Sequence, residues 1–226
     1  MVVRTRVTSK SELELLVAAF DKEVRPVGKR ELEQYPTPAE LVAHMTWIGH
    51  LKGDIESKTI SDLGCGDARL AIGSLLLGAR RAVCVDVDED ILRYGTSIVE
   101  RHFRDLRARL ISVVADATEI SLNSIDTIIM NPPFGVVRGN RGLDVKFLLN
   151  AVKNSKSVYS IHKYSRGFIE ILQKLVKSWN RSIEWFEVLN LSIPMMYQRH
   201  RRKVYRVKSI FLVLRERGLN ELHSTR

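Results

Sequence analysis

The chain has 226 residues and a formal net charge of +10, with 36 lysines and arginines against 26 acidic residues. This length suits one α/β domain with a complete core, and the positive excess favours a polyanionic partner such as RNA. No apolar run is long enough to span a membrane, and the N-terminus (MVVRTRVTSK) lacks the apolar segment of a signal peptide. We therefore expect a cytoplasmic protein.

Apolar spacing predicts helices at residues 13–20 and 41–48, separated by the segment LEQYPTP at residues 32–38. The prolines of that segment favour extended backbone. Extended backbone leaves three polar side chains free to close over a bound ligand: Gln34, Tyr35 and Thr37. A simple helix cap at Thr37 explains the same pattern equally well.

A glycine turn follows the next predicted strand, Thr59–Leu63, and leads into a helix at residues 68–77. Such a turn lets the backbone approach a ligand at the helix N-terminus. Arg69 takes the place of the last glycine of a dinucleotide motif, and the Asp67 carboxylate repels phosphate but accepts a hydrogen bond from ammonium. These features favour S-adenosylmethionine over a dinucleotide, although an ordinary strand-to-helix turn is the alternative. The turn residues predicted to bind the cofactor are Asp62, Gly64, Gly66 and Asp67.

The next two predicted strands each lead to an acidic residue. Residues 81–85 lead to Asp86, about 20 positions past the glycines, where a carboxylate can bind two ribose hydroxyls. Residues 109–115 lead to Asp116, which can bind the adenine amine of the cofactor, while the small Ala117 leaves room for the ring. Val87 completes the predicted cofactor site on these strands.

The motif Asn131, Pro132, Pro133 and Phe134 ends the apolar run 125–130 and is the most informative feature. The Asn131 amide oxygen and the Pro132 carbonyl could accept both N–H bonds of a planar amine and direct its lone pair at a methyl donor. Phe134 could stack on the flat substrate. Asn131 lies where it could also contact the cofactor. The alternative is an ordinary Pro-Pro turn.

Strands alternating with helices predict a parallel sheet with helices on both faces, and ligands bind such sheets at the carboxyl ends of the strands. The predicted site residues all lie at those ends. A basic connection suited to RNA phosphates lies between the last two predicted strands, residues 183–191 and 204–214. The predicted RNA-binding residues are Arg199, Arg201, Arg202, Lys203 and Lys163. Residues 101–109 form a second basic cluster, and solubility or a heat-adapted composition is the alternative explanation.

Cysteine and histidine usage gives no metal-binding pattern. Cys65 and Cys84 lack metal-ligand spacing, and the six histidines form no cluster. We expect no metal and two reduced cysteines. His162 and Lys163, at the end of a further strand, could approach the acceptor or the RNA backbone, although a structural role is the more economical interpretation.

Five segments occur together in one order: LEQYPT at 32–37, DLGCG at 62–66, DVDED at 86–90, NPPFG at 131–135 and VYSIHK at 158–163. This set resembles the methyltransferase-like protein five family, class I methyltransferases that modify adenine N6 in small-subunit ribosomal RNA. The resemblance covers about residues 30 to 215. It implies a Rossmann-like α/β fold, with a seven-stranded, mostly parallel sheet, an antiparallel C-terminal strand and helices on both faces.

The resemblance also implies a single domain, with residues 1–50 as a helical cap and cofactor lid and residues 58–216 as the catalytic core. It assigns the cofactor to Gln34, Thr37, Gly64, Asp67, Asp86, Asp116 and Ala117, and the target adenine to residues 131–134. Eukaryotic members work with a small zinc-binding activator subunit, which would pair here with the edge strand Arg109 to Ala115. An uncovered apolar edge strand would be a liability.

The chain departs from the family in three places. Ala68 replaces a third glycine and would be strained at positive φ, Asp67 replaces a second cysteine, and residues 199–203 are unusually basic. Three other functions use related chemistry or the same fold: methylation of a guanine amine in RNA, methylation of a glutamine amide in protein, and a non-catalytic role in ribosome assembly.

Overall fold

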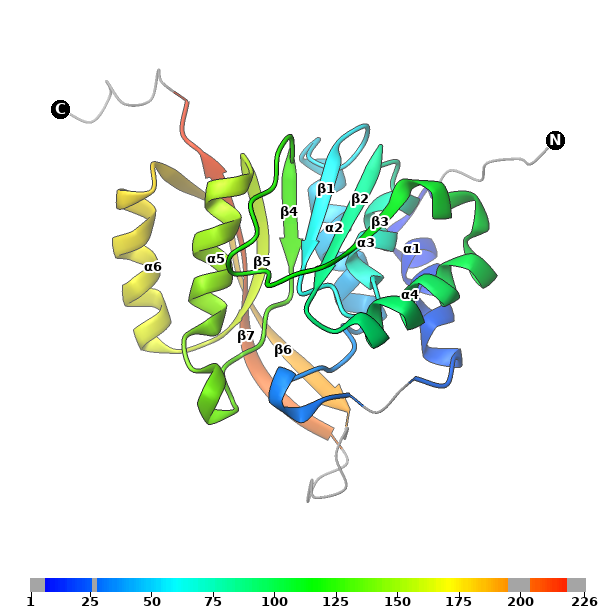
Figure 1. Ribbon diagram of the computed structural model, residues 1–226. Helices are drawn as coiled ribbons and strands as arrows, with labels where there is room; N and C mark the ends of the chain where they lie inside the picture. The colour runs from blue at the N-terminus through cyan, green and yellow to red at the C-terminus, as the bar shows by residue number, and fades with distance from the viewer. Residues whose placement is uncertain (1–6, 26–27, 195–203, 219–226) are drawn as a thin grey trace.

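The structure is a computed structural model that describes residues 7–25, 28–194 and 204–218. Its centre is a seven-stranded sheet in the order β3-β2-β1-β4-β5-β7-β6 (Figure 1). The strands are β1 (Thr59–Leu63), β2 (Arg81–Asp86), β3 (Leu110–Val114), β4 (Thr127–Met130), β5 (Ser157–Lys163), β6 (Arg181–Pro194) and β7 (Val204–Glu216). Strands β1 to β5 are parallel, whereas β7 is antiparallel to both β5 and β6. The predicted Rossmann-like architecture is confirmed.

Helices cover both faces of the sheet (Figure 1). They are α1 (Lys10–Val17), α2 (Ala39–Leu51), α3 (Arg69–Leu76), α4 (Glu89–His102), α5 (Leu143–Asn154) and α6 (Arg166–Ser178). The first four share one apolar core, and α5 and α6 share the other. Alternation along β4 supplies both cores, because Ile129 joins the first and Ile128 and Met130 join the second.

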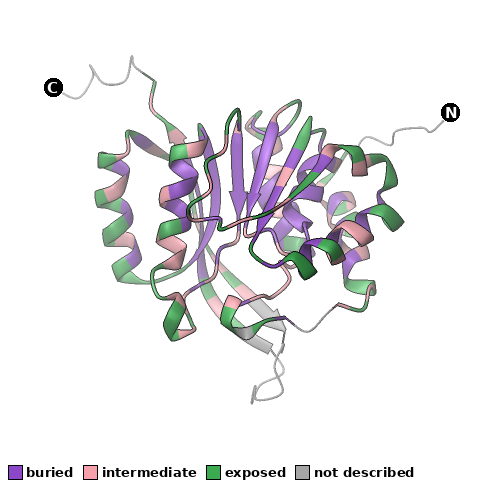
Figure 2. Cartoon of the chain, in the orientation of Figure 1, coloured by how far each residue is buried: buried purple, intermediate pink, exposed green. Residues whose placement is uncertain are grey.

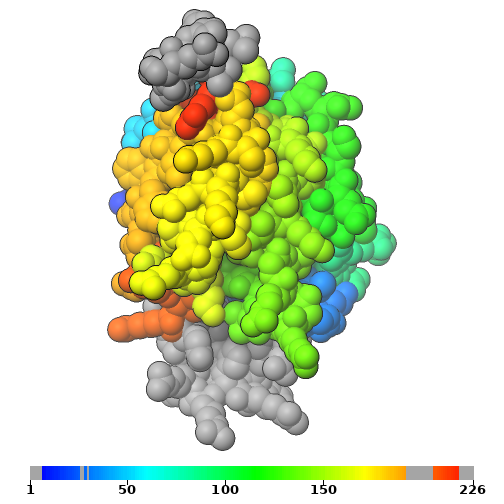
Figure 3. Space-filling view, turned by 90° about the vertical axis from the view of Figure 1, so that its left-hand side faces the viewer, coloured from blue at the N-terminus to red at the C-terminus, as the bar shows by residue number. Residues whose placement is uncertain are grey.

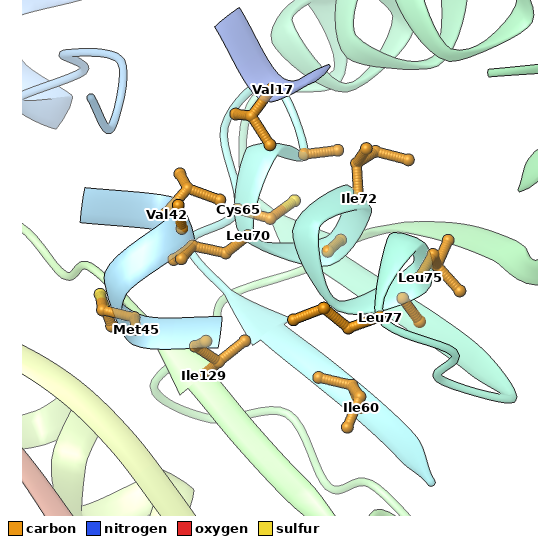
Figure 4. Packing of buried hydrophobic residues seen from close by; sticks show 14 of the residues in the cluster. Val17, Val42, Met45, Ile60, Cys65, Leu70, Ile72, Leu75, Leu77 and Ile129 are labelled. Atoms are coloured by element: carbon orange, nitrogen blue, oxygen red, sulfur yellow. The ribbon is translucent and has the colours of Figure 1, made fainter. Parts of the chain in front are cut away.

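Burial follows this layering (Figure 2). Every residue of β1 and β4 is buried, as expected for parallel strands covered on both faces. In the first core, Val17 of α1, Val42 of α2 and Ile72 of α3 belong to the same cluster as Ile60 and Ile129 of the sheet, and Val42 lies next to Leu70 of α3 (Figure 4). This packing fixes the N-terminal helices to the glycine turn that begins α3.

The two cysteines form a disulfide, so the expectation of reduced thiols is wrong for this structure. Cys84 lies on β2 opposite Asp62 of β1, and Cys65 follows β1 by two residues in the turn. Their Cα atoms are 5.5 Å apart, a separation that a disulfide spans without backbone movement. The two cysteines are 19 residues apart in the sequence and come together only through the register of β1 and β2, which the sequence pattern does not give.

Two further properties concern the described part of the chain. No helix within it is long and apolar enough to cross a membrane. Within the same residues, no three side chains of the metal-binding types converge on a point where an ion could bind.

Candidate functional site

A cavity of about 220 Å³ lies at the carboxyl ends of the parallel strands. Residues after β1, β2, β3 and β4 line it, together with the extended segment before α2. The predicted cofactor residues that line the cavity are Gln34, Tyr35, Thr37, Gly64, Gly66, Asp67, Asp86, Val87, Asp116, Ala117 and Asn131. The structure thus brings together residues more than 90 positions apart in the chain, as ligand sites in open α/β sheets require.

The glycine turn has positive φ at alternate residues: 68° at Gly64, 53° at Gly66 and 71° at Ala68. A Cβ at Gly64 would lie 2.9 Å from the Phe147 ring, so glycine is needed there for both conformation and space. At Gly66 a Cβ would meet nothing within 4 Å, which leaves open space beside the backbone. Ala68 adopts this left-handed conformation, so the alanine carries the strain that a glycine would avoid.

Asp86 is held by backbone donors on both oxygens. Its Oδ2 accepts a hydrogen bond from the Gly66 N–H at 2.8 Å, and its Oδ1 accepts one from the Asp88 N–H at 3.0 Å. Burial raises the pKa of Asp86, although these N–H bonds favour its charged form. The carboxylate is therefore fixed at the cavity wall and keeps lone pairs for ligand hydroxyls.

Asp116 and Ala117 form the adjoining wall. The Asp116 Oδ1 accepts hydrogen bonds from the Thr118 N–H and hydroxyl, both at 2.7 Å. This local turn fixes the carboxylate just beyond β3. Ala117 is buried, and its carbonyl accepts a bond from the Asn150 amide of α5, which ties the wall to the second core.

Asp62 does not line the cavity, in contrast to its predicted role as a cofactor residue. It is 1% exposed, and its Oδ2 accepts a hydrogen bond from the Ala71 N–H in the first turn of α3. Burial raises the pKa of Asp62 well above its usual range, and the nearby carboxylates of Asp86 and Asp67 act in the same direction. Asp62 thus holds α3 behind the glycine turn.

Asp67 lines the cavity but is already engaged by arginines. Its Oδ2 accepts a hydrogen bond from Arg69 Nε at 3.0 Å and lies 3.6 Å from Arg25 Nε. Arg69 also donates to the Asp21 carboxylate from its Nη1 at 2.5 Å. The carboxylate is therefore the centre of an ion-pair cluster as well as the predicted acceptor for ammonium.

Asn131 is oriented by the segment before α2. Its Nδ2 donates a hydrogen bond to Thr37 Oγ1 at 3.1 Å. Its buried Oδ1 has no hydrogen-bond partner in the described part of the chain. A buried acceptor without a partner is costly and is typical of a binding site. Thr37 is not the N-cap of α2, because Pro38 holds that position without a side-chain bond.

The other motif residues divide between cavity and core. Pro133 lines the cavity, whereas Pro132 is buried and outside the lining. Phe134 is only 6% exposed and packs on Tyr35, with 5.7 Å between ring centroids. Stacking of Phe134 on a substrate therefore stays a prediction and requires Tyr35 or the following loop to move.

The segment before α2 is fixed to the sheet edge by hydrogen bonds that the sequence patterns did not indicate. Asp88 accepts hydrogen bonds from Gln34 Nε2 at 2.8 Å and Lys29 Nζ at 2.9 Å. Glu33 Oε1 accepts one from the Val137 N–H at 2.8 Å, and Asn140 Nδ2 lies 3.2 Å from the same oxygen. In Figure 3, the segment before α2 (blue) accordingly lies beside the segment between β4 and α5 (light green). These bonds join both sides of the cavity.

The predicted basic residues have different outcomes. Arg199, Arg201, Arg202 and Lys203 lie outside the described residues, whereas Lys163 is exposed at the end of β5. The backbone of β6 and β7 pairs to Pro194 and Val204, beyond the end of β5 on the cavity side.

The second basic cluster is partly engaged in ion pairs. Arg101 pairs with Glu23 and Arg107 pairs with Glu100. Residues 104–109 form a 3₁₀ helix at the amino end of β3. The cavity lies at the other end of the parallel strands, where their carboxyl ends meet.

His162 is fully buried and outside the cavity. Its Nε2 is 2.7 Å from Ser160 Oγ, its Nδ1 is 3.3 Å from Asp144 Oδ2, and its ring stacks on Phe168. Burial lowers the pKa of His162, although Asp144 opposes this effect. The arrangement agrees with the structural interpretation, since Asp144 belongs to the first turn of α5.

Several cavity residues were not predicted from the sequence: Arg25, Leu32, Glu33, Cys65, Asn140, Leu143 and Phe147. Leu32 and Glu33 belong to the LEQYPT segment and Cys65 to the turn, so motif membership could have indicated them. Arg25 and Phe147 lie outside every motif, and tertiary structure alone places them here.

Comparison with known proteins agrees with this geometry. The family model of ribosomal protein L11 methyltransferase (PrmA) matches residues 45–132. The rRNA N(6)-adenosine-methyltransferase METTL5 of Danio rerio is 35% identical over 187 residues, which cover 80% of this chain and 87% of that protein. The Drosophila melanogaster Mettl5 is 36% identical over 181 residues, which cover 76% and 81% of the two chains. This chain belongs to the METTL5 family.

A solved structure supports the same fold over most of the chain. A candidate RNA methyltransferase from Pyrococcus horikoshii has a TM-score of 0.77 at 28% identity and covers 93% of this chain and 99% of that one. The PrmA match ends at Pro132, so it covers the cofactor half and stops within the NPPF motif. The protein is an S-adenosylmethionine-dependent methyltransferase.

The cavity residues suit that cofactor. Asp86 and Asp116 are fixed carboxylates of the kind that can accept hydrogen bonds from hydroxyls and amines, and the turn at Gly64 and Gly66 allows close approach to the backbone. No phosphate site is needed, and the acidic residues Asp67 and Asp86 would disfavour one. At the cavity wall, Asn131 Oδ1 is a buried acceptor without a partner among the described residues.

Proposed function

We propose that this protein transfers a methyl group from S-adenosylmethionine to N6 of an adenine in small-subunit ribosomal RNA. The observation that carries the proposal is the buried Asn131 Oδ1, an acceptor without a partner at the wall of the cofactor cavity. An amine with two N–H bonds would satisfy it. The names of the METTL5 relatives supply the target base and the class of RNA.

The reaction depends mainly on positioning. When bound, the cofactor supplies an electrophilic methyl group on a sulfonium. Asn131 Oδ1 and the Pro132 carbonyl accept the two N–H bonds of the adenine amine, which directs the nitrogen lone pair toward that methyl. Thr37 keeps the amide in this orientation by accepting the bond from Nδ2. Since the neutral amine becomes acidic only once methylated, its proton can leave to water without a dedicated base.

The proposed RNA path crosses the carboxyl edge of the sheet. Five exposed cations follow the carboxyl ends of β4 and β5 and form no ion pair with the described residues: Arg138, Arg141, Lys146, Lys163 and Arg166. Together with residues 199–203 they would contact phosphates. Activity should therefore fall steeply as salt rises, whereas methylation of a neutral protein would be much less affected.

We also propose that a small zinc-binding activator pairs with β3. This strand is one edge of the sheet, and Ile111 and Val114 are 41% and 56% exposed there. Strand addition would satisfy the open backbone groups and cover these side chains. Residues 1–50 would act as cap and cofactor lid in the same single domain, and the protein would work in the cytoplasm.

The test uses the purified full chain, tritiated S-adenosylmethionine and ribosomal RNA from a strain that lacks the gene. Label should appear in N6-methyladenosine after nucleoside digestion. Asn131→Ala should abolish it, whereas the control Asn123→Ala, in an exposed loop, should not.

Other outcomes separate the rival functions. Label in a guanosine would replace adenine as the target, and label in ribosomal protein instead of RNA would replace the substrate class. If the cofactor binds but no RNA or protein is labelled, addition of the activator decides between a dependent enzyme and an inactive assembly factor.

A further inference from the structure

Arg25 is a cationic residue of the cavity that belongs to none of the sequence motifs. Its side chain is 12% exposed and lines the cavity beside the glycine turn. Both Nε and Nη1 are buried and have no hydrogen-bond partner in the described part of the chain. Burying guanidinium donors without acceptors is unfavourable, so the arrangement favours binding of an anionic or polar group beside Arg25.

The neighbouring carboxylate does not satisfy this guanidinium. Asp67 Oδ2 lies 3.6 Å from Arg25 Nε, beyond hydrogen-bond distance, because the same oxygen is bonded to Arg69 Nε at 3.0 Å. Asp67 thus anchors Arg25 electrostatically and leaves its donors open. Gly95 of α4 packs so closely on Asp67 that a Cβ would lie 2.6 Å from its carbonyl, and the anchor has little room to shift.

The charges around the cavity distinguish its two ends. Asp86 and Asp116 suit the ribose and the adenine, so the amino-acid part of the cofactor lies toward the turn at Gly66 and Asp67. That part carries a carboxylate as well as an ammonium. Among the described residues that line the cavity, four are acidic and Arg25 is the one cation. An anionic group bound among four acids needs that cation.

We propose that Arg25 binds the carboxylate of the cofactor's amino-acid group. The guanidinium donates to the carboxylate oxygens, while Asp67 holds it from behind and remains near enough to face the ammonium. Arg25 thereby selects a donor with an intact amino-acid group. This role concerns the cofactor alone and does not depend on which nucleotide or protein is methylated.

The experiment measures equilibrium binding by isothermal titration calorimetry, without any methyl acceptor. The probes are S-adenosylmethionine and its decarboxylated form, which keeps the sulfonium and ammonium and lacks only the carboxylate. The wild-type chain should bind the intact cofactor about tenfold to a hundredfold more tightly. Arg25→Met should abolish most of that preference by weakening the intact cofactor alone, and Arg25→Lys should keep part of it. Arg93→Met, an exposed arginine of α4, is the matched control and should keep the full preference.

Two results would overturn the proposal. The first is equal affinity of the wild-type chain for both probes, a measurement that needs no variant to fold. The second is an Arg25→Met chain that weakens both probes alike, since a merely structural role would act on the whole cavity.

Discussion

The hydrogen bond between Asn131 and Thr37 should affect the rate of methyl transfer more than it affects the affinity for the cofactor. Thr37→Val removes the acceptor for Asn131 Nδ2 and keeps nearly the same shape. The amide then has a buried donor without a partner, which costs about 1–3 kcal/mol, or it turns and presents N–H groups to an amine that itself donates. Because about 1.4 kcal/mol corresponds to tenfold in rate, the methylation rate should fall about fivefold to more than a hundredfold.

The assay is single-turnover methylation of ribosomal RNA at saturating S-adenosylmethionine, with the cofactor Kd measured separately by calorimetry. We expect the Kd of Thr37→Val to rise by less than the rate falls, since the variant removes at most the one predicted cofactor contact of Thr37 and leaves Asp86 and Asp116 unchanged. Thr37→Ser is the control, because it restores the hydroxyl and should recover most of the rate.

Either of two observations would refute this reasoning. One is a Thr37→Val enzyme as fast as wild type. The other is a Thr37→Ser enzyme as slow as Thr37→Val, which would show that the methyl group of Thr37, rather than its hydroxyl, supports Asn131.

Three further predictions concern stability. Ala68→Gly should change the unfolding free energy by less than about 1 kcal/mol, because relief at positive φ offsets the lost methyl, whereas Ala71→Gly within α3 should cost about 1–2 kcal/mol in urea unfolding. Because burial raises the pKa of Asp62 in the folded state, the folded chain binds this proton more tightly than the unfolded chain does. The free energy of unfolding should therefore fall as pH rises from about 4 toward the raised pKa. Asp62→Asn should flatten this part of a plot of Tm against pH. Reducing the Cys65–Cys84 disulfide, which closes a loop of 19 residues, should lower stability by about 3 kcal/mol in parallel unfolding curves with and without reductant, and equal curves would contradict this.

Much of the fold followed from local pattern. The apolar runs of β1 and β2 and the glycine turn between β1 and α3 are encoded within short segments, so their positions were predicted to within one or two residues. The meeting of the turn, Asp86, Asp116 and Asn131 at one edge followed from a general property of parallel sheets, not from any one motif.

The features that the sequence did not indicate depend on register and side-chain direction. Cys65 and Cys84 meet only because β1 and β2 pair in one particular register. Asp62 points to α3 instead of the cavity because strand residues alternate in direction, and one residue decides the face. Phe134 is buried under Tyr35, a contact between segments about 100 positions apart that no local pattern could indicate.

At position 67 this chain has aspartate where the family has cysteine, and the structure shows which residue stabilises that buried charge. A buried carboxylate with no partner would be strongly destabilising, and here Arg69, itself 3% exposed, neutralises Asp67 at 3.0 Å. The two residues should therefore behave as a unit. Asp67→Ala should lower the free energy of unfolding in urea by about 3–5 kcal/mol, because it leaves the buried Arg69 paired only with the half-exposed Asp21. Alanine is preferred to the family's cysteine here because it adds no third thiol near the disulfide.

The double variant Asp67→Ala, Arg69→Met should recover most of that loss, because an apolar side chain of similar length replaces the stranded charge. If the losses in unfolding free energy from the two substitutions simply add, the Arg69 charge is stabilised mainly by Asp21 and by the Phe20 ring. That ring lies 5.3 Å from the guanidinium carbon of Arg69. The compensation would then lie between α3 and the N-terminal helices, and Asp67 would be free to serve the cofactor alone.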